Sequence, residues 1–597
     1  MSTGAPRRTV DTIDRRVGLM FGIFVLLLFV GILRAGYLGT IRAGALRHAA
    51  NAQQVKFAAV PAPRGEITDR NGVVYAISEP SDSVYVDPIE INKSYSDPQT
   101  VATKLAPLLK LTAARTLALI TKPGTGYVQL AVGVPAATTA KIMKLQVTAT
   151  SPPGVNGVWD VPTERRAYPR GTELAQVLGW ADGNSGADGL ESEFNNVLAG
   201  VSGRRRTVFD AQGKAINIET PKSMIPGKNM KLTISAPLQS EVEQVLAGVA
   251  AQYKPVGATA IVTDPQTDQV LALANWPSLN LDSIPSSALK SVGGQVPVAE
   301  DQAVDLSYEP GSTFKAVTVA GALQDGLVTP STEFSIPPYL MAPGNPSPYK
   351  VSDSEQHGYE QLSVAEILKV SSNIGADKIG QRLGPLRFGY WVNRFGFGKY
   401  TGVALSGEQR GIILQPSGYS GASMYNLPFG QGESVTPMQM VQAYDAIADG
   451  GILRTPQIID SIGSNSQPEP KGKRIISSQV AYELRSMLRS VLTDQGTASG
   501  AAIPGYDMAG KTGTAQIADR GGYSKNKFIA SFIGMVPASK PKLVVAVVVD
   551  QPQGAIYGGS VAAPAFQKIV GWAVPHFGIN PCPPSACPSS AMHPTMP

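Results

Sequence analysis

The hydrophobic pattern of the chain has one long uninterrupted run, close to the N-terminus. Val17 to Leu33 are seventeen consecutive uncharged residues. As a helix they would span roughly 26 Å, near the lower limit for the hydrocarbon core of a bilayer. Arg34 can extend its charge toward the interface, and residues 35–38 lengthen the usable span. The pattern therefore predicts a transmembrane helix over residues 17–38.

Four basic residues precede this run: Arg7, Arg8, Arg15 and Arg16. By the positive-inside rule they keep residues 1–16 in the cytoplasm and place the rest of the chain outside. A cleaved signal peptide is the alternative. The run is long for one, and no convincing small-x-small cleavage site follows it. We favour a retained single-pass anchor in the cell membrane.

Beyond the anchor, the spacing of hydrophobic residues is typical of helices in some stretches and of strands in others. A polar, alanine-rich helix is expected over Arg42–Phe57, and a new unit is expected to begin with a strand near residue 229. Residues 257–273 alternate and turn at Asp264-Pro265, which predicts a β-hairpin of a larger sheet. Further helices are expected over residues 236–250, 314–323, 363–370 and 374–383.

Length and composition exclude several classes of protein. The chain has 597 residues, which suggests three or four structural units. It is 43% hydrophobic and 16% charged, as globular proteins are, and its net charge of +6 is too small and scattered to indicate nucleic-acid binding. The four histidines lie far apart, which weakens a histidine-metal site or a Ser-His-Asp triad. The two cysteines, Cys582 and Cys587, lie in a Pro/Ser-rich tail expected to be disordered, and whether they pair is open.

The candidate chemistry begins at Glu309-Pro310-Gly311-Ser312-Thr313-Phe314-Lys315. Proline and glycine end the preceding element, and Ser312 opens an apolar-periodic run, so it is expected at a helix N-terminus with Lys315 one turn later. An amine in reach of the hydroxyl can take its proton, which serine needs to become a nucleophile. The S-x-x-K pattern occurs five times in the chain, so it is weak by itself.

Two further patterns follow in a fixed order. Ser371-Ser372-Asn373 interrupts a helical stretch 59 residues after Ser312, and Lys511-Thr512-Gly513 follows Asn373 by 138 residues. The second is the only K-[ST]-G in the chain, on a small-residue strand where Gly513 leaves room for a substrate backbone. S-x-N alone is also weak, because it occurs elsewhere. The order of all three is what gives them weight.

With these motifs in this order, the chain resembles the penicillin-binding protein and serine β-lactamase superfamily. Other stretches resemble class B penicillin-binding proteins in particular. They are Arg64-Gly65 to Asn71-Gly72, Arg166 with Tyr168-Pro169, Gly189-Leu190-Glu191, Phe429-Gly430-Gln431-Gly432 and Ala448-Asp449-Gly450-Gly451. The motif sequence usual in this class is not found at two places, Asp301-Gln302-Ala303 and Ser235-Ala236.

The resemblance implies a fold and a domain order. The expected fold is an α/β (α+β) penicillin-binding transpeptidase domain, a sheet flanked by helices, on an elongated pedestal with one transmembrane helix. The expected parts are a cytoplasmic segment 1–16, the membrane helix 17–38, a pedestal (dimerisation) domain 39–225, a transpeptidase domain 226–576 and a disordered tail 577–597.

The resemblance also assigns roles in a DD-transpeptidase that cross-links peptidoglycan stem peptides and is acylated by β-lactams. Ser312 is the expected nucleophile and Lys315 the proton acceptor, with its pKa lowered by the nearby charge of Lys511. Ser371 passes the proton to the leaving amine, and Asn373 orients Lys315 and the substrate. Lys511 with Thr512 and Thr514 binds the terminal carboxylate, and Gly513 belongs to the same substrate-binding segment. The backbone N–H groups of Ser312 and Thr514 form the oxyanion hole. No metal or organic cofactor is required.

Other functions remain as alternatives. A class A β-lactamase shares the motif order, but no E-x-x-L-N stretch lies between Asn373 and Lys511. A β-lactam sensor needs a signalling domain, for which a short cytoplasmic segment leaves no room, and a non-catalytic scaffold would not need the complete motifs. The resemblance implies SEDS-type glycosyltransferase and divisome membrane partners. The sequences of the motifs favour a septal, FtsI-like role over an elongation role.

Overall fold

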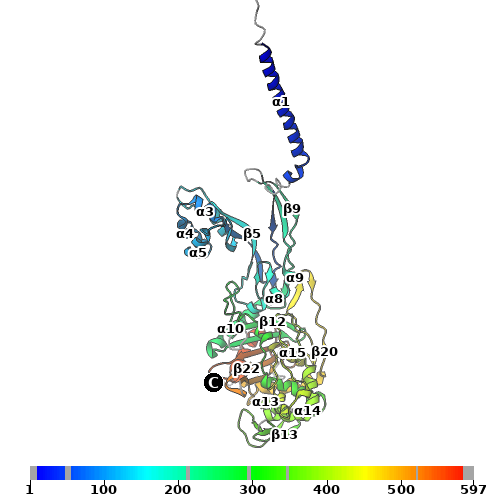
Figure 1. Ribbon diagram of the computed structural model, residues 1–597. Coiled ribbons are helices and arrows are strands. Elements are labelled where there is room, and N and C mark those ends of the chain that lie inside the picture. Colours follow the sequence, from blue (N-terminus) through cyan, green and yellow to red (C-terminus); the bar gives the residue numbers. More distant parts are fainter. Residues whose placement is uncertain are drawn as a thin grey trace, which may run out of the picture. The chain divides into compact units, whose positions relative to one another are not determined.

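The computed structural model describes residues 10–47, 55–148, 150–209, 215–291, 297–344, 348–519 and 522–582 (Figure 1). The chain divides into two compact units. The first is formed by Met1–Ala62 and Val201–Ile225, and the second by Pro63–Gly200 and Pro226–Pro597. The first unit is thus built from two separate stretches of sequence, because the chain leaves the second unit after Gly200 and returns to it at Pro226.

The first unit begins with helix α1, Val10–Gly39. Its apolar segment, within Asp14–Gly39, has a mean hydropathy of 2.5 and is not buried inside the protein. At 1.5 Å per residue, this segment of 26 residues spans about 39 Å, enough for the hydrocarbon core of a bilayer. Phe21 and Leu27 are 66% and 64% exposed. The apolar helix expected over residues 17–38 is present as part of this longer helix.

The first unit also contains a three-stranded sheet of order β1-β8-β9, with β1 Val55–Val60, β8 Gly203–Phe209 and β9 Ala215–Lys222. The guanidinium of Arg204 lies 3.8 Å from the ring centroid of Phe57, and Arg206 pairs with Glu219 at 3.0 Å. The helix predicted over Arg42–Phe57 is therefore wrong at its end, because Val55 to Phe57 pair with β8. Residues 48–54 of that prediction lie outside the described residues.

The second unit begins with a sheet of order β19-β18-β10-β2-β3-β4, in which β5 also pairs with β3. Its strands are β2 Ile67–Thr68, β3 Val74–Val86, β4 Val128–Pro135, β5 Val158–Ala167, β10 Met230–Leu232, β18 Ile459–Ile462 and β19 Asn465–Ser466. Helices α3 Pro88–Ser94, α4 Pro98–Leu108, α5 Ala113–Ile120 and α6 Ala136–Met143 enclose a small separate core with the far half of β3.

The larger sheet of the second unit is antiparallel, of order β12-β11-β23-β22-β21. Its strands are β11 Gly257–Asp264, β12 Gln269–Trp276, β21 Ala509–Asp519, β22 Gly522–Val536 and β23 Leu543–Asp550. Every residue of β23 is buried, as expected of a central strand covered on both faces. The hairpin predicted over residues 257–273 corresponds to β11 and β12.

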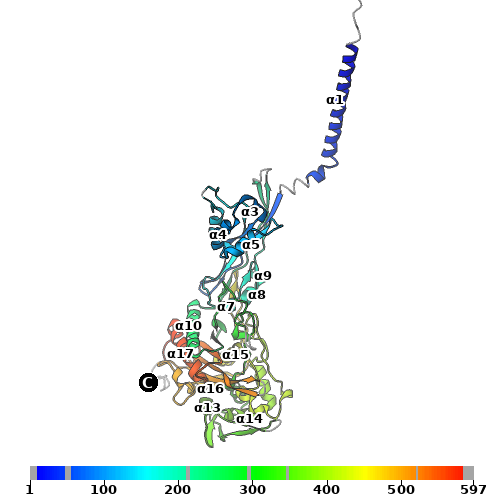
Figure 2. The same cartoon turned by 60° about the vertical axis from the view of Figure 1, so that its left-hand side comes forward.

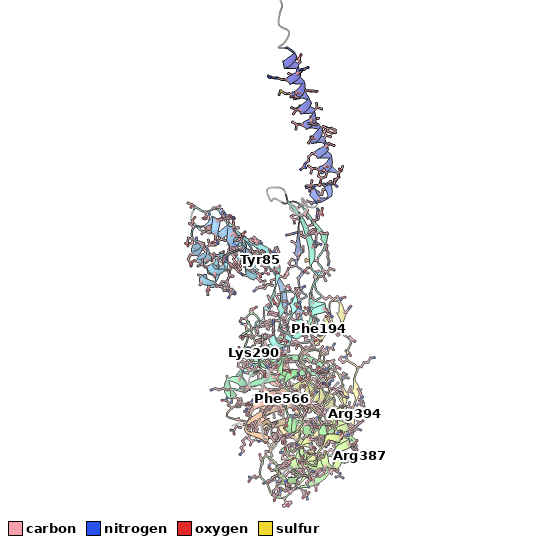
Figure 3. All side chains as sticks on the ribbon, in the orientation of Figure 1. Tyr85, Phe194, Lys290, Arg387, Arg394 and Phe566 are labelled. Carbon is pink, nitrogen blue, oxygen red and sulfur yellow. The ribbon has the colours of Figure 1, made fainter. Side chains whose placement is uncertain are left out.

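Helices cover both faces of this sheet. On one face α10, Ala236–Tyr253, and α17, Gly558–His576, lie side by side (Figure 2). There the ring of Phe566, which is labelled in Figure 3, packs against the ring of Phe532 of β22, with 4.7 Å between the two ring centroids. The opposite face belongs to the largest apolar cluster, with α12 Lys315–Gln324, α13 Val364–Val370, α14 Asn373–Arg394, α15 Pro437–Ala448 and α16 Ser478–Arg489.

The helix predicted to end at Leu383 continues to Arg394, but Gly384 has non-helical angles of φ 73° and ψ 161°. Proline at position 385 follows, so the predicted end coincides with a kink in α14. The other elements are short. They are α7 Ala175–Leu178, β6 Ala181–Asp182, β7 Ser185–Gly186, α8 Gly189–Glu193, α9 Asn195–Leu198, α11 Gln302–Asp305, β13 Glu333–Ile336, β14 Leu340–Ala342, β15 Tyr349–Val351, β16 Glu360–Ser363, β17 Ile452–Leu453 and β20 Lys473–Arg474, with 3₁₀ turns η1 Gly311–Phe314, η2 Pro416–Gly418, η3 Ser423–Tyr425, η4 Leu427–Phe429, η5 Ser490–Leu492 and η6 Ser499–Ala501.

Candidate active site

Ser312 lies in the 3₁₀ turn η1, and α12 begins at Lys315, three residues later. Gly311 has a φ of +55°, which a residue with a side chain rarely adopts, and its N–H donates to the carbonyl of Gly430 at 3.0 Å. The hydroxyl of Tyr444 donates to the carbonyl of Thr313 at 2.8 Å. The turn is therefore held from both sides, with Ser312 half-buried at its centre.

Lys315 is completely buried, and its amine contacts the S-x-N segment. The Nζ donates to the main-chain oxygen of Ser371 at 2.5 Å and to Oδ1 of Asn373 at 2.8 Å, and it lies 3.3 Å from Oγ of Ser371. Ser371 separates α13 from α14 and has a φ of +62°. Nδ2 of Asn373 donates to the carbonyl of Ser352 at 3.1 Å, so its oxygen faces the lysine. The structure thus brings Lys315, Ser371 and Asn373 together.

Burial lowers the pKa of Lys315 to about 7, because the site offers little water to solvate the ammonium. Asp353 and Asp377 act in the opposite direction. Burial, and not the charge of Lys511 expected from the sequence, is the main cause of this lowering. Lys511 is equally buried, and its own pKa is lowered well below the usual value by burial and by the charge of Lys315. Near pH 7, a substantial fraction of Lys315 is therefore the neutral amine that can accept a proton.

Asp353 is a functional candidate that sequence reasoning missed. Its carboxylate accepts from the hydroxyl of Ser372 at 2.7 Å and from the N–H groups of Asn373 and Ile374 at 2.5 and 3.0 Å. A carboxylate at these N–H groups satisfies donors that the first turn of a helix leaves free. It fixes the start of α14, and with it the position of Asn373. Twenty residues separate Asp353 from Asn373, and no local pattern joins them.

Asp377 was missed as well. It lies one turn after Asn373 on α14, is fully buried, and neither carboxylate oxygen has a hydrogen-bond partner among the described residues. Burial raises its pKa well above the usual value, although the charge of Lys315 acts against this. The spacing of four residues from Asn373 was a usable signal, because such residues share a helix face.

The K-T-G segment lies on β21, the outermost strand of the sheet order. A Cβ atom at Gly513 would lie 2.3 Å from Oγ of Ser531 and 3.0 Å from the carbonyl oxygen of Pro310. The glycine therefore lets β21 pack against β22 and the nucleophile turn, and the substrate-side role expected from the sequence stays a prediction. Oγ1 of Thr514 accepts from the N–H of Gly558 at 3.1 Å, and Oγ1 of Thr512 lies 2.8 Å from that of Thr497.

Comparison with known proteins assigns the chain to a family. A family model described as the penicillin binding protein transpeptidase domain matches residues 258–571, more than half of the chain. A second, described as the penicillin-binding protein dimerisation domain, matches residues 59–232. The chain belongs to the class B penicillin-binding proteins.

Relatives match this penicillin-binding protein over most of their length. The stage V sporulation protein D of Bacillus subtilis is 31% identical over 574 residues, which cover 94% of this chain and 85% of that protein. The peptidoglycan D,D-transpeptidase FtsI of Escherichia coli is 30% identical over 592 residues, 97% of this chain and 95% of that one. The crystal structure of penicillin binding protein 3 of Mycobacterium tuberculosis with aztreonam matches at a TM-score of 0.65 and 28% identity, covering 88% of this chain and 99% of that one.

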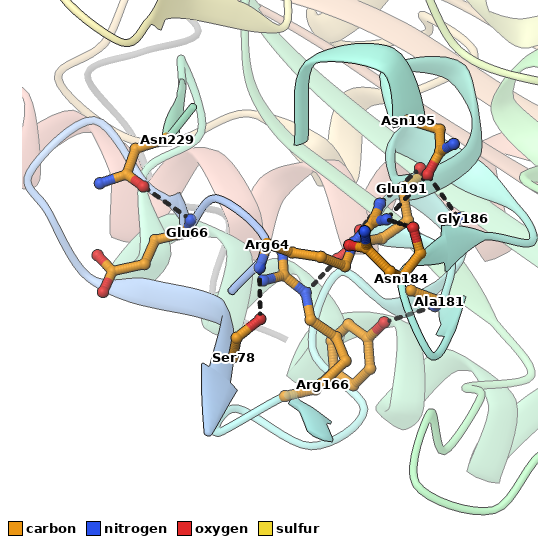
Figure 4. Close-up of polar contacts among 11 residues, drawn as sticks. Arg64, Glu66, Ser78, Arg166, Ala181, Asn184, Gly186, Glu191, Asn195 and Asn229 are labelled. Atoms are coloured by element: carbon orange, nitrogen blue, oxygen red, sulfur yellow. Dashed lines mark hydrogen bonds and ion pairs between the residues drawn. The ribbon is translucent and has the colours of Figure 1, made fainter. Parts of the chain in front are cut away.

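The pedestal motifs of this penicillin-binding protein meet in one buried cluster (Figure 4). Glu191 accepts from Nε and Nη2 of Arg64 at 2.9 and 2.7 Å and from Nε of Arg166 at 2.6 Å. All three side chains are at most 2% exposed. Nη1 of Arg64 also donates to the carbonyl of Asn184 and to Oδ1 of Asn195, both at 2.8 Å. Three motifs that are separate in sequence therefore form a single structural unit.

Proposed function

We propose that Ser312 is the nucleophile with which this penicillin-binding protein acts as a peptidoglycan DD-transpeptidase. The observation that carries the proposal is the buried amine of Lys315, whose pKa is lowered to about 7 and whose position is set by Ser371 and Asn373. Such an amine is neutral often enough at physiological pH to serve as a general base. Its partner is the half-buried serine one turn earlier, on a turn that Gly311 and Gly430 hold in place.

The reaction proceeds in two acyl transfers. Ser312 Oγ attacks the carbonyl of the penultimate D-alanine while its proton passes to Lys315, and the C–N bond to the terminal D-alanine breaks. The leaving amine receives that proton through the hydroxyl of Ser371. An amine of a neighbouring strand then attacks the ester, loses a proton to Lys315, and Ser312 regains one as the cross-link forms. A β-lactam acylates the same oxygen.

The K-T-G strand supplies the binding groups. Backbone N–H groups of Ser312 and Thr514 form the oxyanion hole, an interaction worth roughly 3–4 kcal/mol per donor. Lys511 and Thr512 bind the terminal carboxylate. Because Oγ1 of Thr514 accepts from Gly558, its own proton is directed elsewhere and can be donated to that carboxylate. Gly513 keeps this strand close to the nucleophile turn.

The anchor and the relatives support a proposal for the cellular role. We propose that residues 1–16 are cytoplasmic, that residues 17–38 cross the cell membrane, and that the pedestal 39–225 carries the transpeptidase domain 226–576 outside, with 577–597 as a tail. The tail beyond residue 582, including Cys587, lies outside the described residues. Relatives named peptidoglycan D,D-transpeptidase FtsI and PenA support a role in cell-wall synthesis. We further propose, from the motif resemblance, that this role is septal and that a SEDS-type glycosyltransferase and divisome membrane proteins are the partners.

Intact-protein mass spectrometry with benzylpenicillin tests the proposed nucleophile. The unmodified chain should gain one stable adduct, and Ser312→Ala should gain none. Ser287→Ala, which alters another S-x-x-K pattern, is the matched control and should still be acylated. An adduct that persists in Ser312→Ala would refute the assignment, and rapid turnover of the drug without an adduct would indicate a hydrolase.

A further inference from the structure

A cavity of about 400 Å³ lies at the end of α14 that is farther from the candidate active site. α14 begins at Asn373 and ends at Arg394, which lines the cavity and is labelled in Figure 3. Residues from the loop 396–401 form a second wall, and strands β17 and β20, which pair with each other, contribute to a third. None of the lining residues takes part in the proposed reaction, and we call this space the basic cavity.

The charges around the basic cavity have one sign. Five of its lining side chains are cationic, and none of the lining residues is an aspartate or a glutamate. The cations are Arg394, Lys399, Arg454, Lys471 and Lys473. Like charges that face one space repel one another, and an anion that enters the space replaces this repulsion by attraction. The cavity therefore favours a negatively charged ligand.

Only one of the five cations is paired with a carboxylate among the described residues. Nη1 of Arg454 pairs with Asp449 at 2.5 Å. Arg394 donates to the main-chain oxygens of Ile475 and Arg474, both at 3.1 Å, which satisfies two of its N–H groups without cancelling its charge. The three lysines have no ion pair with any described residue. Most of the positive charge is therefore available to a ligand.

Buried amides hold the two loops that carry part of this charge. Nε2 of Gln439 donates to the carbonyl of Lys399 at 2.7 Å, and Nε2 of Gln442 donates to the carbonyl of Arg454 at 2.7 Å. Both glutamines belong to α15 and are 1% and 7% exposed. On the third wall, the two hydrogen bonds of Arg394 hold the end of β20 against α14. The backbone of the cavity is thus in place before a ligand arrives, which reduces the ordering cost of binding.

Two tyrosines give the cavity a second kind of surface. Tyr390 and Tyr400 line it and are 54% and 58% exposed. The guanidinium of Arg394 lies 5.9 Å from the ring centroid of Tyr390, so a cation and an aromatic ring occur together at this wall. A tyrosine ring has an apolar face and a polar tip, and the C–H face of a sugar ring can pack on it. Asn393 and Thr455 also line the cavity and can form hydrogen bonds with sugar hydroxyls.

We propose that the basic cavity binds a phosphate-bearing sugar, as one unit of an anionic polysaccharide. Lys399, Lys471 and Lys473 hold the phosphate, and Tyr390 and Tyr400 pack against the sugar. A volume of about 400 Å³ lies within the range of about 300–1,000 Å³ typical of small-molecule sites, so the cavity accommodates one such unit. In the proposed membrane orientation, the cavity lies outside the cytoplasm, where a polysaccharide of the cell surface can reach it. The proposal goes beyond the proposed function and does not require Ser312 to be the nucleophile.

The test uses the full chain in a non-ionic detergent and N-acetylglucosamine 1-phosphate as the probe, with binding followed by the ³¹P line width in NMR. Inorganic phosphate, N-acetylglucosamine and a hexaglutamate peptide are added as competitors, so that the phosphate, the sugar and an acidic protein segment are each tested alone. The variants are Tyr400→Ala and the double variant Lys471→Gln with Lys473→Gln. Lys540→Gln with Lys542→Gln is the matched control, because these two exposed lysines have the same spacing and lie outside the cavity lining. The melting temperature of each variant reports whether the fold is intact.

Wild type and the control should bind the probe with a Kd of about 1 mM or lower, and the double lysine variant should bind it at least about fivefold more weakly. Tyr400→Ala should weaken binding of the probe about threefold and leave the Kd of inorganic phosphate unchanged, because only the sugar contacts the ring. Raising the salt concentration from about 50 to about 300 mM should weaken binding, since it screens the lysines. No binding to wild type, or equal Kd values for the double lysine variant and its control, would overturn the proposal. Displacement of the probe by hexaglutamate at a lower concentration than by free N-acetylglucosamine 1-phosphate would also overturn it, in favour of an acidic protein partner.

Discussion

Glu191 neutralises two buried arginines, and replacing it by alanine would leave both guanidinium charges without a counter-ion. The carboxylate lies 2.7 Å from Arg64 and 2.6 Å from Arg166, and these side chains are 0–2% exposed. Nη1 and Nη2 of Arg166 have no hydrogen-bond partner among the described residues, so Glu191 reaches this guanidinium only through Nε. Removing one member of a buried ion pair costs about 3–5 kcal/mol. Because two pairs are lost together, we expect Glu191→Ala to cost about 5 kcal/mol, a large share of the 5–15 kcal/mol typical of a folded domain.

Urea unfolding of the full chain in detergent, followed by tryptophan fluorescence, measures this loss. Glu79→Ala is the matched control, because Glu79 pairs with Arg165 at 2.6 Å on the same pedestal but the two side chains are 47% and 41% exposed. An exposed pair contributes about 0–1 kcal/mol, so this variant should unfold close to wild type. Similar small shifts for both variants would refute the reasoning, since they would mean that burial does not distinguish the two pairs.

Three further predictions concern the active site. The rate of acylation by benzylpenicillin should rise with pH through about 7 and then level off, because the neutral form of Lys315 accepts the proton and its pKa is about 7; a flat profile between pH 5 and 9 in a stopped-flow assay would contradict this. Asn373→Asp places a negative charge 2.8 Å from the lysine Nζ and should move that midpoint upward by about one pH unit, so an unchanged midpoint would show that Asn373 does not set the environment of Lys315. Gly513→Ala would force a Cβ to within 2.3 Å of Ser531 Oγ, so it should slow acylation at least about tenfold and lower the melting temperature. Gly500→Ala is the control, because no atom lies within 4 Å of its new Cβ, and it should change neither quantity. Equal behaviour of the two variants would refute the packing role of Gly513.

Local spacing accounts for the part of the site that could be predicted. Ser312 and Lys315 are one turn apart, so a helical start alone places them together. Asn373 and Lys511 could be assigned only by resemblance to a family, because nothing in their spacing fixes a contact. Asp353 was missed because its role depends on how the start of α14 folds onto another segment, whereas the helical spacing of Asp377 from Asn373 was a signal that was not used.

The fold shows the same limit. The hairpin of β11 and β12 follows from alternation within its own residues, and it was predicted. The helix predicted over Arg42–Phe57 was wrong at its end, because pairing with β8, about 150 residues later, overrides the local preference of an alanine-rich stretch. Arg64, Arg166 and Glu191 were noted as separate motifs, and only tertiary structure makes them one cluster.

The contact between Lys315 and Ser371 uses a main-chain oxygen, at 2.5 Å. A codon change can replace the hydroxyl of Ser371, but it cannot delete the carbonyl that every residue carries. The φ of +62° means that glycine or asparagine would keep this carbonyl in place more readily than other replacements. A substitution of Ser371 can therefore weaken this hold on the lysine only by shifting the backbone, and not by removing the acceptor. The contact of the lysine with Asn373 Oδ1, in contrast, is made by a side chain and can be removed by one substitution.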